Sequence, residues 1–196
     1  MSEIPLFPLH TVLFPQGILS LRIFEPRYID MISACLKTDT GFGVCLIRDG
    51  NEVGAAAEFY TTGTLAKITD WHTLPDGLLG ITALGQQRFA VLSQHTKPNQ
   101  LITAAVEMIA NEPECEIPAL YSPLVDLLSQ VLAQLGPAYA EMYTKYSDAS
   151  WVGCRLTELL PLAPAVKQEL LQLSDPVQRL ERLYAVLENL AAEQAN

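Results

Sequence analysis

The sequence predicts an α+β protein: an amino-terminal, barrel-like antiparallel sheet with one early helix, followed by a carboxy-terminal helical bundle. Between residues 42 and 109, short apolar or alternating runs are separated by turn sequences about every 10 to 15 residues, which is typical of a closed or nearly closed sheet. After residue 118, leucines recur at helical spacing. Residues 110–118 are polar, acidic and twice broken by proline, so we expect subdomains 1–112 and 113–196.

The chain opens on an apolar stretch, residues 4–28, that prolines interrupt. The prolines stand at positions 5, 8, 15 and 26. Each proline fixes its own φ and lacks an amide hydrogen, so neither a regular helix nor a central strand accommodates the pattern. We therefore expect short extended pieces whose apolar side chains seed the core.

One helix is predicted to begin at Pro26, because a proline in the first helical turn lacks only a donor that would be unpaired there. Apolar residues then recur at helical spacing, at Tyr28, Ile29, Ile32, Cys35 and Leu36. The helix is expected to end before Gly41.

The predicted sheet follows this helix. Residues 42–47 form a continuous apolar run, which indicates a strand covered on both faces. The Leu-Pro-Asp-Gly sequence at 74–77 predicts a hairpin, because proline presets φ and glycine tolerates a positive φ. Further reversals of the chain are expected at residues 85–86 and 97–99.

The second half of the chain predicts a series of helices. They cover residues 120–135, a shorter stripe formed by Tyr139, Met142, Tyr143 and Tyr146, residues 151–160 and residues 164–173. The last helix begins after Asp175, because the aspartate, proline and glutamine at 175, 176 and 178 have the pattern of a capping box. We interpret its apolar seam as packing within the bundle, with a partner-binding coiled coil as the alternative.

Composition favours a soluble, folded protein. The 196 residues are 49% hydrophobic and 17% charged, and the mean hydropathy is positive. The net charge of −10 disfavours nucleic acid as a partner, because phosphate binding needs clustered Lys and Arg. The sequence has no basic leader and no run of about 18 apolar residues, so we expect no membrane partner and a cytoplasmic location. The cysteines at 35, 45, 115 and 154 show no paired spacing and are expected to be free thiols.

No catalytic motif emerges, so we expect a non-enzymatic protein with no catalytic residues, no cofactor and no metal. Gly80 and Gly85 reproduce the glycine spacing of a phosphate-binding loop, but glutamines follow where lysine and a hydroxyl residue are required. We interpret both glycines as turn residues. The histidines at 10, 72 and 95 lack metal-ligand spacing and are expected in exposed turns or edges.

The order of motifs resembles the Lon substrate-binding domain, the amino-terminal domain of Lon protease. The matching segments are IPLFPL at 4–9, LFP at 13–15, LRIFEPRY at 21–28, FGVCL at 42–46, VG at 53–54, GQQRF at 85–89 and LPLAP at 160–164. Ser20 departs from the pattern, because the family usually has proline there. The resemblance implies a PUA-like pseudobarrel followed by helices, without the ATPase and peptidase regions of full-length Lon. It also implies recognition of protein segments, since Lon uses this domain to engage substrates.

Eight residues within these motifs are candidates for binding. The apolar candidates are Phe7, Phe14, Ile18 and Phe24, and the polar candidates are Glu25, Arg27, Tyr28 and Arg88. The apolar set either contacts hydrophobic side chains of unfolded segments or belongs to the core. The arginines either hold a ligand carboxylate or peptide carbonyl, or pair with Glu25 to fix how the first helix meets the sheet.

We therefore expect a peptide-recognition module, an adaptor or regulator of proteolysis. Its expected partners are unfolded or flexible protein segments and a separate ATP-dependent protease, and the sequence leaves its oligomeric state open. One alternative is a small-molecule sensor, because the related cereblon architecture joins a Lon-type domain to a ligand-binding domain. Another is a hydrolase that uses His10 or His72, which would need a carboxylate within about 3 Å of the histidine.

Overall fold

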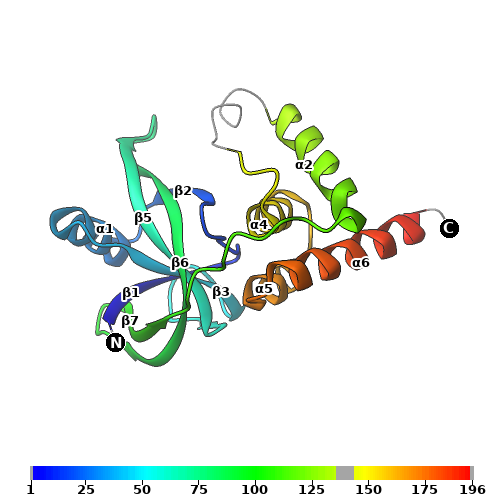
Figure 1. Ribbon diagram of the computed structural model, residues 1–196. Helices are drawn as coiled ribbons and strands as arrows, with labels where there is room; N and C mark the ends of the chain where they lie inside the picture. The colour runs from blue at the N-terminus through cyan, green and yellow to red at the C-terminus, as the bar shows by residue number, and fades with distance from the viewer. Residues whose placement is uncertain (1, 136–143, 195–196) are drawn as a thin grey trace. The chain divides into compact units, whose positions relative to one another are not determined.

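A sheet that closes on itself organises the first part of the chain (Figure 1). The computed structural model describes residues 2–135 and 144–194, and the chain divides into two compact units, 1–111 and 112–196. Within the described residues, the first unit contains β1 (Ser2–Leu9), β2 (Ile18–Ile23), α1 (Pro26–Thr38), β3 (Phe42–Asp49), β4 (Glu58–Phe59), β5 (Thr62–Thr73), β6 (Leu79–Thr96) and β7 (Ile102–Met108). The division lies one residue before the predicted boundary, and the independence of the two units as domains stays a prediction.

The strands follow the order β1-β7-β6-β5-β3-β4, and an additional pairing between β1 and β3 closes the ring. β2 pairs with β6 outside this path. Every pairing is antiparallel except the one between β1 and β3, which is parallel. The predicted antiparallel sheet is therefore present, with one parallel exception at the point of closure.

β1 shows how a strand can contain two prolines and still have neighbours on both sides. Residues 2–6 pair with β7 and residues 6–9 pair with β3, so Leu6 is the residue shared by both registers. Pro5 and Pro8 each lie in a part of the strand that is paired on one side. A proline nitrogen can face the unpaired side without loss of a ladder hydrogen bond. The stretch is therefore not a plain central strand, as expected, because neither proline lies where the strand has neighbours on both sides.

The early helix α1 has the predicted start and end. Pro26 occupies its first turn, and Asp39 ends it in the left-handed region with a φ of 50°. Its buried side chains join residues of the strands in one apolar cluster: Tyr28, Met31, Ile32 and Cys35. α1 thus covers one face of the sheet.

The predicted hairpin joins β5 and β6, and Gly77 in its turn has a φ of 84°.

The predicted reversal at Gly85 was wrong, because β6 continues without interruption to Thr96. Gly85 instead receives the loop before β2: its N–H donates to the Gly17 oxygen at 2.8 Å, and its oxygen accepts from Gln16 at 2.7 Å. A Cβ on Gly85 would lie 2.1 Å from the Phe14 carbonyl oxygen, so the close approach requires glycine.

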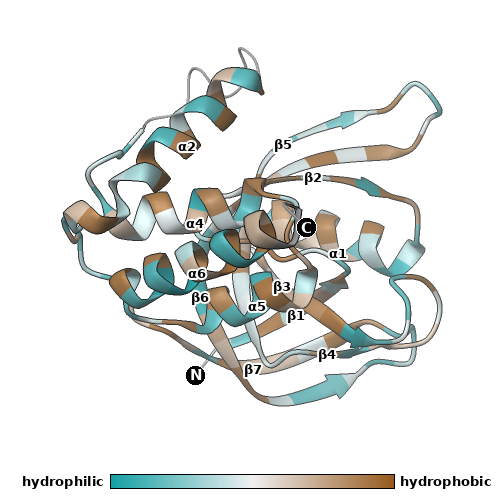
Figure 2. Cartoon of the chain, turned by 90° about the vertical axis from the view of Figure 1, so that its right-hand side faces the viewer, coloured by the Kyte–Doolittle hydropathy of each residue, from teal (hydrophilic) through white to brown (hydrophobic). Residues whose placement is uncertain are grey.

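The second unit is helical within the described residues. It contains the 3₁₀ turn η1 (Ala119–Tyr121) and the helices α2 (Ser122–Gln134), α4 (Ala149–Leu159), α5 (Pro164–Gln172) and α6 (Pro176–Gln194). The carboxylate of Asp175 accepts from Val177 N–H at 2.8 Å, as predicted for a cap. Of the predicted tyrosine and methionine stripe, Tyr139, Met142 and Tyr143 lie outside the described residues. Figure 2 shows hydrophobic residues interspersed with polar ones along these helices.

One ion pair is buried inside this helical unit. Arg179 on α6 is 1% exposed and contacts both carboxylate oxygens of Glu112, at 2.7 Å through Nη1 and at 2.5 Å through Nη2. Arg179 also donates to the carbonyl oxygens of Leu170, at 3.0 Å, and Leu173. The Glu112 carboxylate accepts a further hydrogen bond from Ser150 at 2.6 Å. The pair therefore ties the start of the unit to α4, α5 and α6.

Candidate functional site

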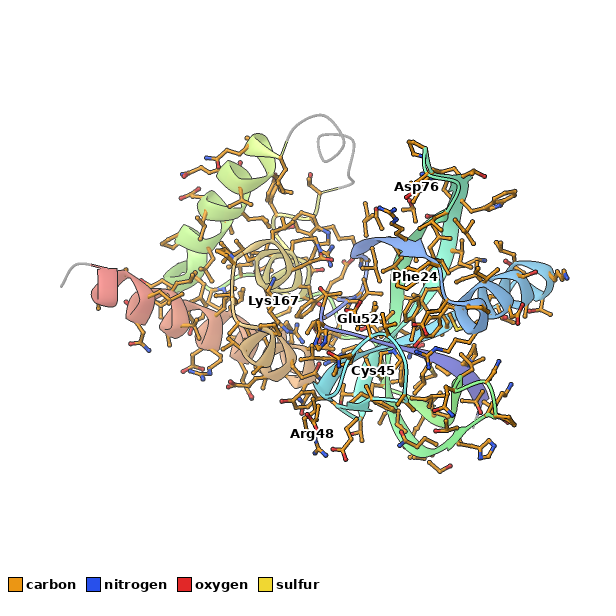
Figure 3. All side chains as sticks on the ribbon, turned by 180° about the vertical axis from the view of Figure 1, so that it is seen from behind. Phe24, Cys45, Arg48, Glu52, Asp76 and Lys167 are labelled. Carbon is orange, nitrogen blue, oxygen red and sulfur yellow. The ribbon has the colours of Figure 1, made fainter. Side chains whose placement is uncertain are left out.

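A shallow apolar depression opens where β2 meets α1, and we call it the Phe24 groove. It has a volume of about 50 Å³ and is lined by Phe7, Leu9, Leu21, Arg22, Ile23, Phe24, Glu25, Tyr28, Glu52 and Val53. Figure 3 labels Phe24 and Glu52 within this part of the first unit. Aromatic and aliphatic side chains dominate the lining, and two carboxylates and one guanidinium stand among them.

The groove's most exposed apolar side chains come from two chain segments that are distant in sequence. Phe24 is 52% exposed and Val53 is 54% exposed. Ile23, at the end of β2, is buried, and strand alternation therefore turns the next side chain, Phe24, away from the core. Val53 lies in the loop between β3 and β4, next to Gly54, which has a φ of 93°. Two large apolar groups thus face solvent beside one depression.

The floor of the groove is rigid because aromatic rings stack within it. Phe7 and Tyr28 stack with ring centroids 3.8 Å apart and an angle of 15° between their planes. Phe7 also contacts Phe42, with centroids 6.0 Å apart. Both Phe7 and Tyr28 are 6% exposed, so they form the base of the groove and leave its rim to Phe24 and Val53.

Arg27 anchors the wall next to this floor. Its guanidinium lies 2.9 Å from the Glu25 carboxylate and 4.7 Å from the centroid of the Tyr28 ring. It also donates to the carbonyl oxygens of Gln100, at 3.0 Å, and Glu52, at 3.4 Å. The Glu52 carboxylate in turn accepts from the His10 N–H at 2.7 Å. This network holds the start of α1, the loop after β3 and the loop after β6 together.

The structure brings together five of the eight residues that the sequence singled out. Phe7, Phe24, Glu25 and Tyr28 line the groove, and Arg27 stands in its wall. The other three lie elsewhere. Phe14 is fully buried, Arg88 is 4% exposed on β6, and Ile18 is exposed on β2 outside the groove lining.

Sequence reasoning did not single out the other residues that line the groove: Leu9, Leu21, Arg22, Ile23, Glu52 and Val53. Leu21 lies on the inner face of β2, in register with Ile81 of β6. Glu52 and Val53 belong to a loop that has no periodic pattern, so periodicity could not place them, although Val53 and Gly54 are among the segments that resemble the Lon domain. The glycine that follows them is the signal that could have marked a turn there.

The histidines lie on the surface, as predicted. His10, His72 and His95 are all exposed. The nearest ion-pairing carboxylate to His72 is that of Asp70, with the Nδ1 to Oδ2 distance at 4.0 Å. None of the three histidines lines the Phe24 groove.

Cysteines and acidic residues add no further site in residues 2–135 and 144–194. None of the four cysteines forms a disulfide in the part of the chain that the structure describes, and Cys35, Cys45 and Cys154 are buried. Within the same ranges, no cluster of three or more His, Cys, Asp or Glu side chains could hold a metal ion. No helix in the described part of the chain has the length and apolar character needed to cross a membrane.

Burial of Tyr28 makes the stability of the protein sensitive to alkaline pH. Burial raises the pKa of Tyr28 from 10.0 to about 12, although Arg27 opposes the shift. Between these values the folded state keeps a proton that the unfolded state loses, so the free energy of unfolding falls as pH rises, by about 2 kcal/mol. Urea unfolding at about pH 8 and about pH 11.5 should show this loss of stability. Tyr28→Phe should lose less stability between these pH values, because it lacks the phenol with the raised pKa while its other tyrosines are the same. An equal loss in both proteins would contradict the assignment.

The sequence and the fold are similar to those of known proteins. The ATP-dependent protease La (LON) substrate-binding domain family matches residues 3–189. The chain belongs to this family. The Lon substrate-binding domain described here is similar to the crystal structure of a Lon N-terminal domain protein from Xanthomonas campestris, with 35% identity and a TM-score of 0.80 over 94% of this chain and 98% of that one.

Other relatives are full-length proteases. The Lon proteases of Parabacteroides distasonis and Escherichia coli K12 are 26% and 25% identical over 95% of this chain. The match spans about a quarter of their length, 24% and 25%. The N-terminal domain of Mycobacterium avium complex Lon protease shares the fold, with a TM-score of 0.62, 16% identity and coverage of 92% of this chain and 95% of that domain. The match is thus to the substrate-binding part of Lon.

Proposed function

We propose that this Lon substrate-binding domain recognises unfolded or flexible protein segments through the Phe24 groove. The observation that carries the proposal is the pair of exposed side chains, Phe24 and Val53, above an aromatic floor. Folded proteins bury most of their large apolar side chains, whereas unfolded segments expose them. A shallow apolar groove therefore favours the unfolded state of a protein over its native state.

The chain then acts without catalysis, as an adaptor or regulator that holds segments for a separate ATP-dependent protease. Membership of the family supports substrate recognition, because the family is described as a substrate-binding domain. The four cysteines are described without a disulfide, which is compatible with our proposal of a cytoplasmic location. We also propose that its ring of strands is a PUA-like pseudobarrel and that the described helices belong to a helical bundle.

The two alternative functions receive less support from the site. A volume of about 50 Å³ for the groove is well below the range of about 300–1,000 Å³ that is usual for small-molecule pockets. For a hydrolase, His72 would need a carboxylate at hydrogen-bond distance, whereas Asp70 lies at 4.0 Å and both side chains are solvent-exposed.

Replacing Phe24 is expected to weaken binding of unfolded proteins without unfolding the domain. The probe is fluorescein-labelled, reduced and carboxymethylated α-lactalbumin, titrated with the protein and followed by fluorescence anisotropy. We expect a micromolar Kd and an increase of about tenfold in Phe24→Ser, because a large apolar contact is lost. Phe24 is 52% exposed, so the thermal midpoint should change little.

Ile29→Ser is the matched control. Ile29 is 41% exposed on α1 and lies outside the groove lining, so its replacement should leave Kd unchanged. Equal binding by wild type and Phe24→Ser would refute the groove as the recognition site. Equal binding of native, disulfide-intact α-lactalbumin would refute the preference for unfolded segments.

A further inference from the structure

Within residues 2–135 and 144–194, β6 is longer than the strand beside it, and this leaves one of its edges open. On one side β6 pairs with β5 as far as Ala90, and the Val91 N–H then donates to the Thr61 oxygen at 2.8 Å. Beyond this point the residues of β6 pair with β7 on the other side. Residues 92–96 are all exposed.

The direction of the free backbone groups follows from the turn after β6. The Lys97 N–H donates to the Leu101 oxygen at 2.8 Å, so Lys97 faces β7. Because antiparallel ladders alternate, His95 also faces β7, and the N–H and C=O groups of Gln94 and Thr96 point to the open edge. The register shift between Val91 and Ser93 accounts for the opposite direction of the Val91 N–H.

A groove runs beside this edge. It has a volume of about 360 Å³ and is lined by Arg48, Glu58, Phe59, Thr61, Val91, Leu92, Ser93 and Gln94. Its other wall belongs to β4, which pairs with β3 alone. Arg48 and Glu58 form an exposed ion pair of 2.7 Å on that wall, and Figure 3 labels Arg48 at a place separate from Phe24.

We propose that the open edge of β6 binds an extended, uncharged segment of another protein as an added strand. The partial charges of the two backbones are complementary: Gln94 and Thr96 present alternating N–H and C=O dipoles, which an extended backbone matches with dipoles of opposite sense. The edge sequence Leu-Ser-Gln-His-Thr contains no lysine, glutamate or proline, the residues that usually block such pairing.

The side chains around the edge indicate which residues the added strand should contain. Leu92 is 48% exposed and shares the groove with Phe59, so alternate residues of the added strand find an apolar contact. The groove's only charged lining residues, Arg48 and Glu58, are already paired with each other, which favours an uncharged segment. This site is separate from the Phe24 groove, so each can fail without the other.

A pair of synthetic peptides tests the proposal. The first is a fluorescein-labelled octapeptide of alternating threonine and valine, and the second is the same peptide with every other amide N-methylated. Wild type should bind the first, and N-methylation should weaken binding at least fivefold, because strand addition depends on backbone hydrogen bonds. Gln94→Pro should weaken binding of the first peptide about five- to tenfold.

Gln94→Pro is suitable because the N–H it removes faces the open edge, where proline is tolerated. Gln94→Ala removes the side chain and keeps the N–H, so it should bind as wild type does. Phe24→Ser should also bind this peptide as wild type does, which separates this test from that of the Phe24 groove. Far-UV circular dichroism and thermal melting verify that each variant is folded.

Three results would overturn the proposal: no binding of the octapeptide to wild type, equal binding of the N-methylated peptide, or equal binding by Gln94→Pro. Light scattering decides whether the occupant is a second copy of the chain. If wild type is a dimer and Gln94→Pro is a monomer, the added strand comes from a second copy of this chain and not from another protein.

Discussion

Arg179→Met is expected to lower the free energy of unfolding of the helical unit by about 3–5 kcal/mol, because it leaves the Glu112 carboxylate buried without its cation. Arg179 and Glu112 are 1% and 7% exposed, so water cannot replace the lost partner. The Leu170 and Leu173 carbonyl oxygens lose a donor as well. The measurement is urea unfolding followed by the fluorescence of Trp151, which is 3% exposed on α4.

The experiment is made in a Trp71→Phe background, so that Trp151 is the sole tryptophan of the two in the sequence. Arg182→Met is the matched control on the same helix. Arg182 pairs with Glu169 at 2.7 Å, but both side chains are nearly half exposed, so its loss should cost about 0–1 kcal/mol. Similar losses in the free energy of unfolding for Arg179→Met and Arg182→Met would show that burial of the Arg179–Glu112 pair does not determine its contribution to stability.

Phe14→Ala is expected to destabilise the strand unit by about 3–5 kcal/mol, because it empties the space of a fully buried ring. The loss should appear as a lower urea midpoint for pulsed labelling of Cys35 and Cys45. Both thiols are buried in this unit, and each becomes reactive when the unit opens. Mass spectrometry of the labelled peptides separates their unfolding from that of Cys154 in the helical unit.

Phe24→Ala is the control for this substitution. The same side chain is removed from a position that is half exposed, so the midpoint for Cys35 and Cys45 should shift by the equivalent of about 1 kcal/mol or less. If Phe14→Ala and Phe24→Ala were equally stable, the assignment of one phenylalanine to the core and the other to the surface would be wrong.

The sequence was most informative where one residue type determines the local backbone. Pro26 at the start of α1 and Gly77 in the hairpin turn were located correctly. In both cases the preference acts within a few residues and does not depend on the rest of the fold. The cap at Asp175 follows the same logic, because its carboxylate bonds to N–H groups two and three residues later.

The errors arose where distant parts of the chain decide the outcome. Gly85 looks like a turn residue, but the carbonyl oxygen of Phe14 approaches it so closely that no Cβ fits. The sequence also does not show how one strand contains two prolines, which depends on a change of partner at Leu6 that leaves each proline an unpaired side. Neither the approach nor the register leaves a trace in the local sequence.

Only part of the candidate site could be predicted from the sequence, because distant parts of the chain decide which of its residues are exposed. Phe14 and Phe24 both lie in a proline-rich apolar segment, and their spacing does not separate buried from exposed positions. The structure does, because Phe24 follows a strand whose last residue, Ile23, is buried. The open edge of β6 was beyond sequence analysis, since it depends on β5 beginning at Thr62 and not earlier.

The closure of the sheet by β1 has a consequence for how the protein folds while it is being synthesised. Ser2 pairs with Val106, so the amino-terminal part of β1 gains its partner only after β7 has been synthesised. At about 5–20 residues per second, translation needs about 5–20 s to supply that partner. During this interval residues 2–5 of β1 lack their ladder partner, while residues 6–9 can already pair with β3, and we expect general chaperones to protect the unpaired part until synthesis reaches β7.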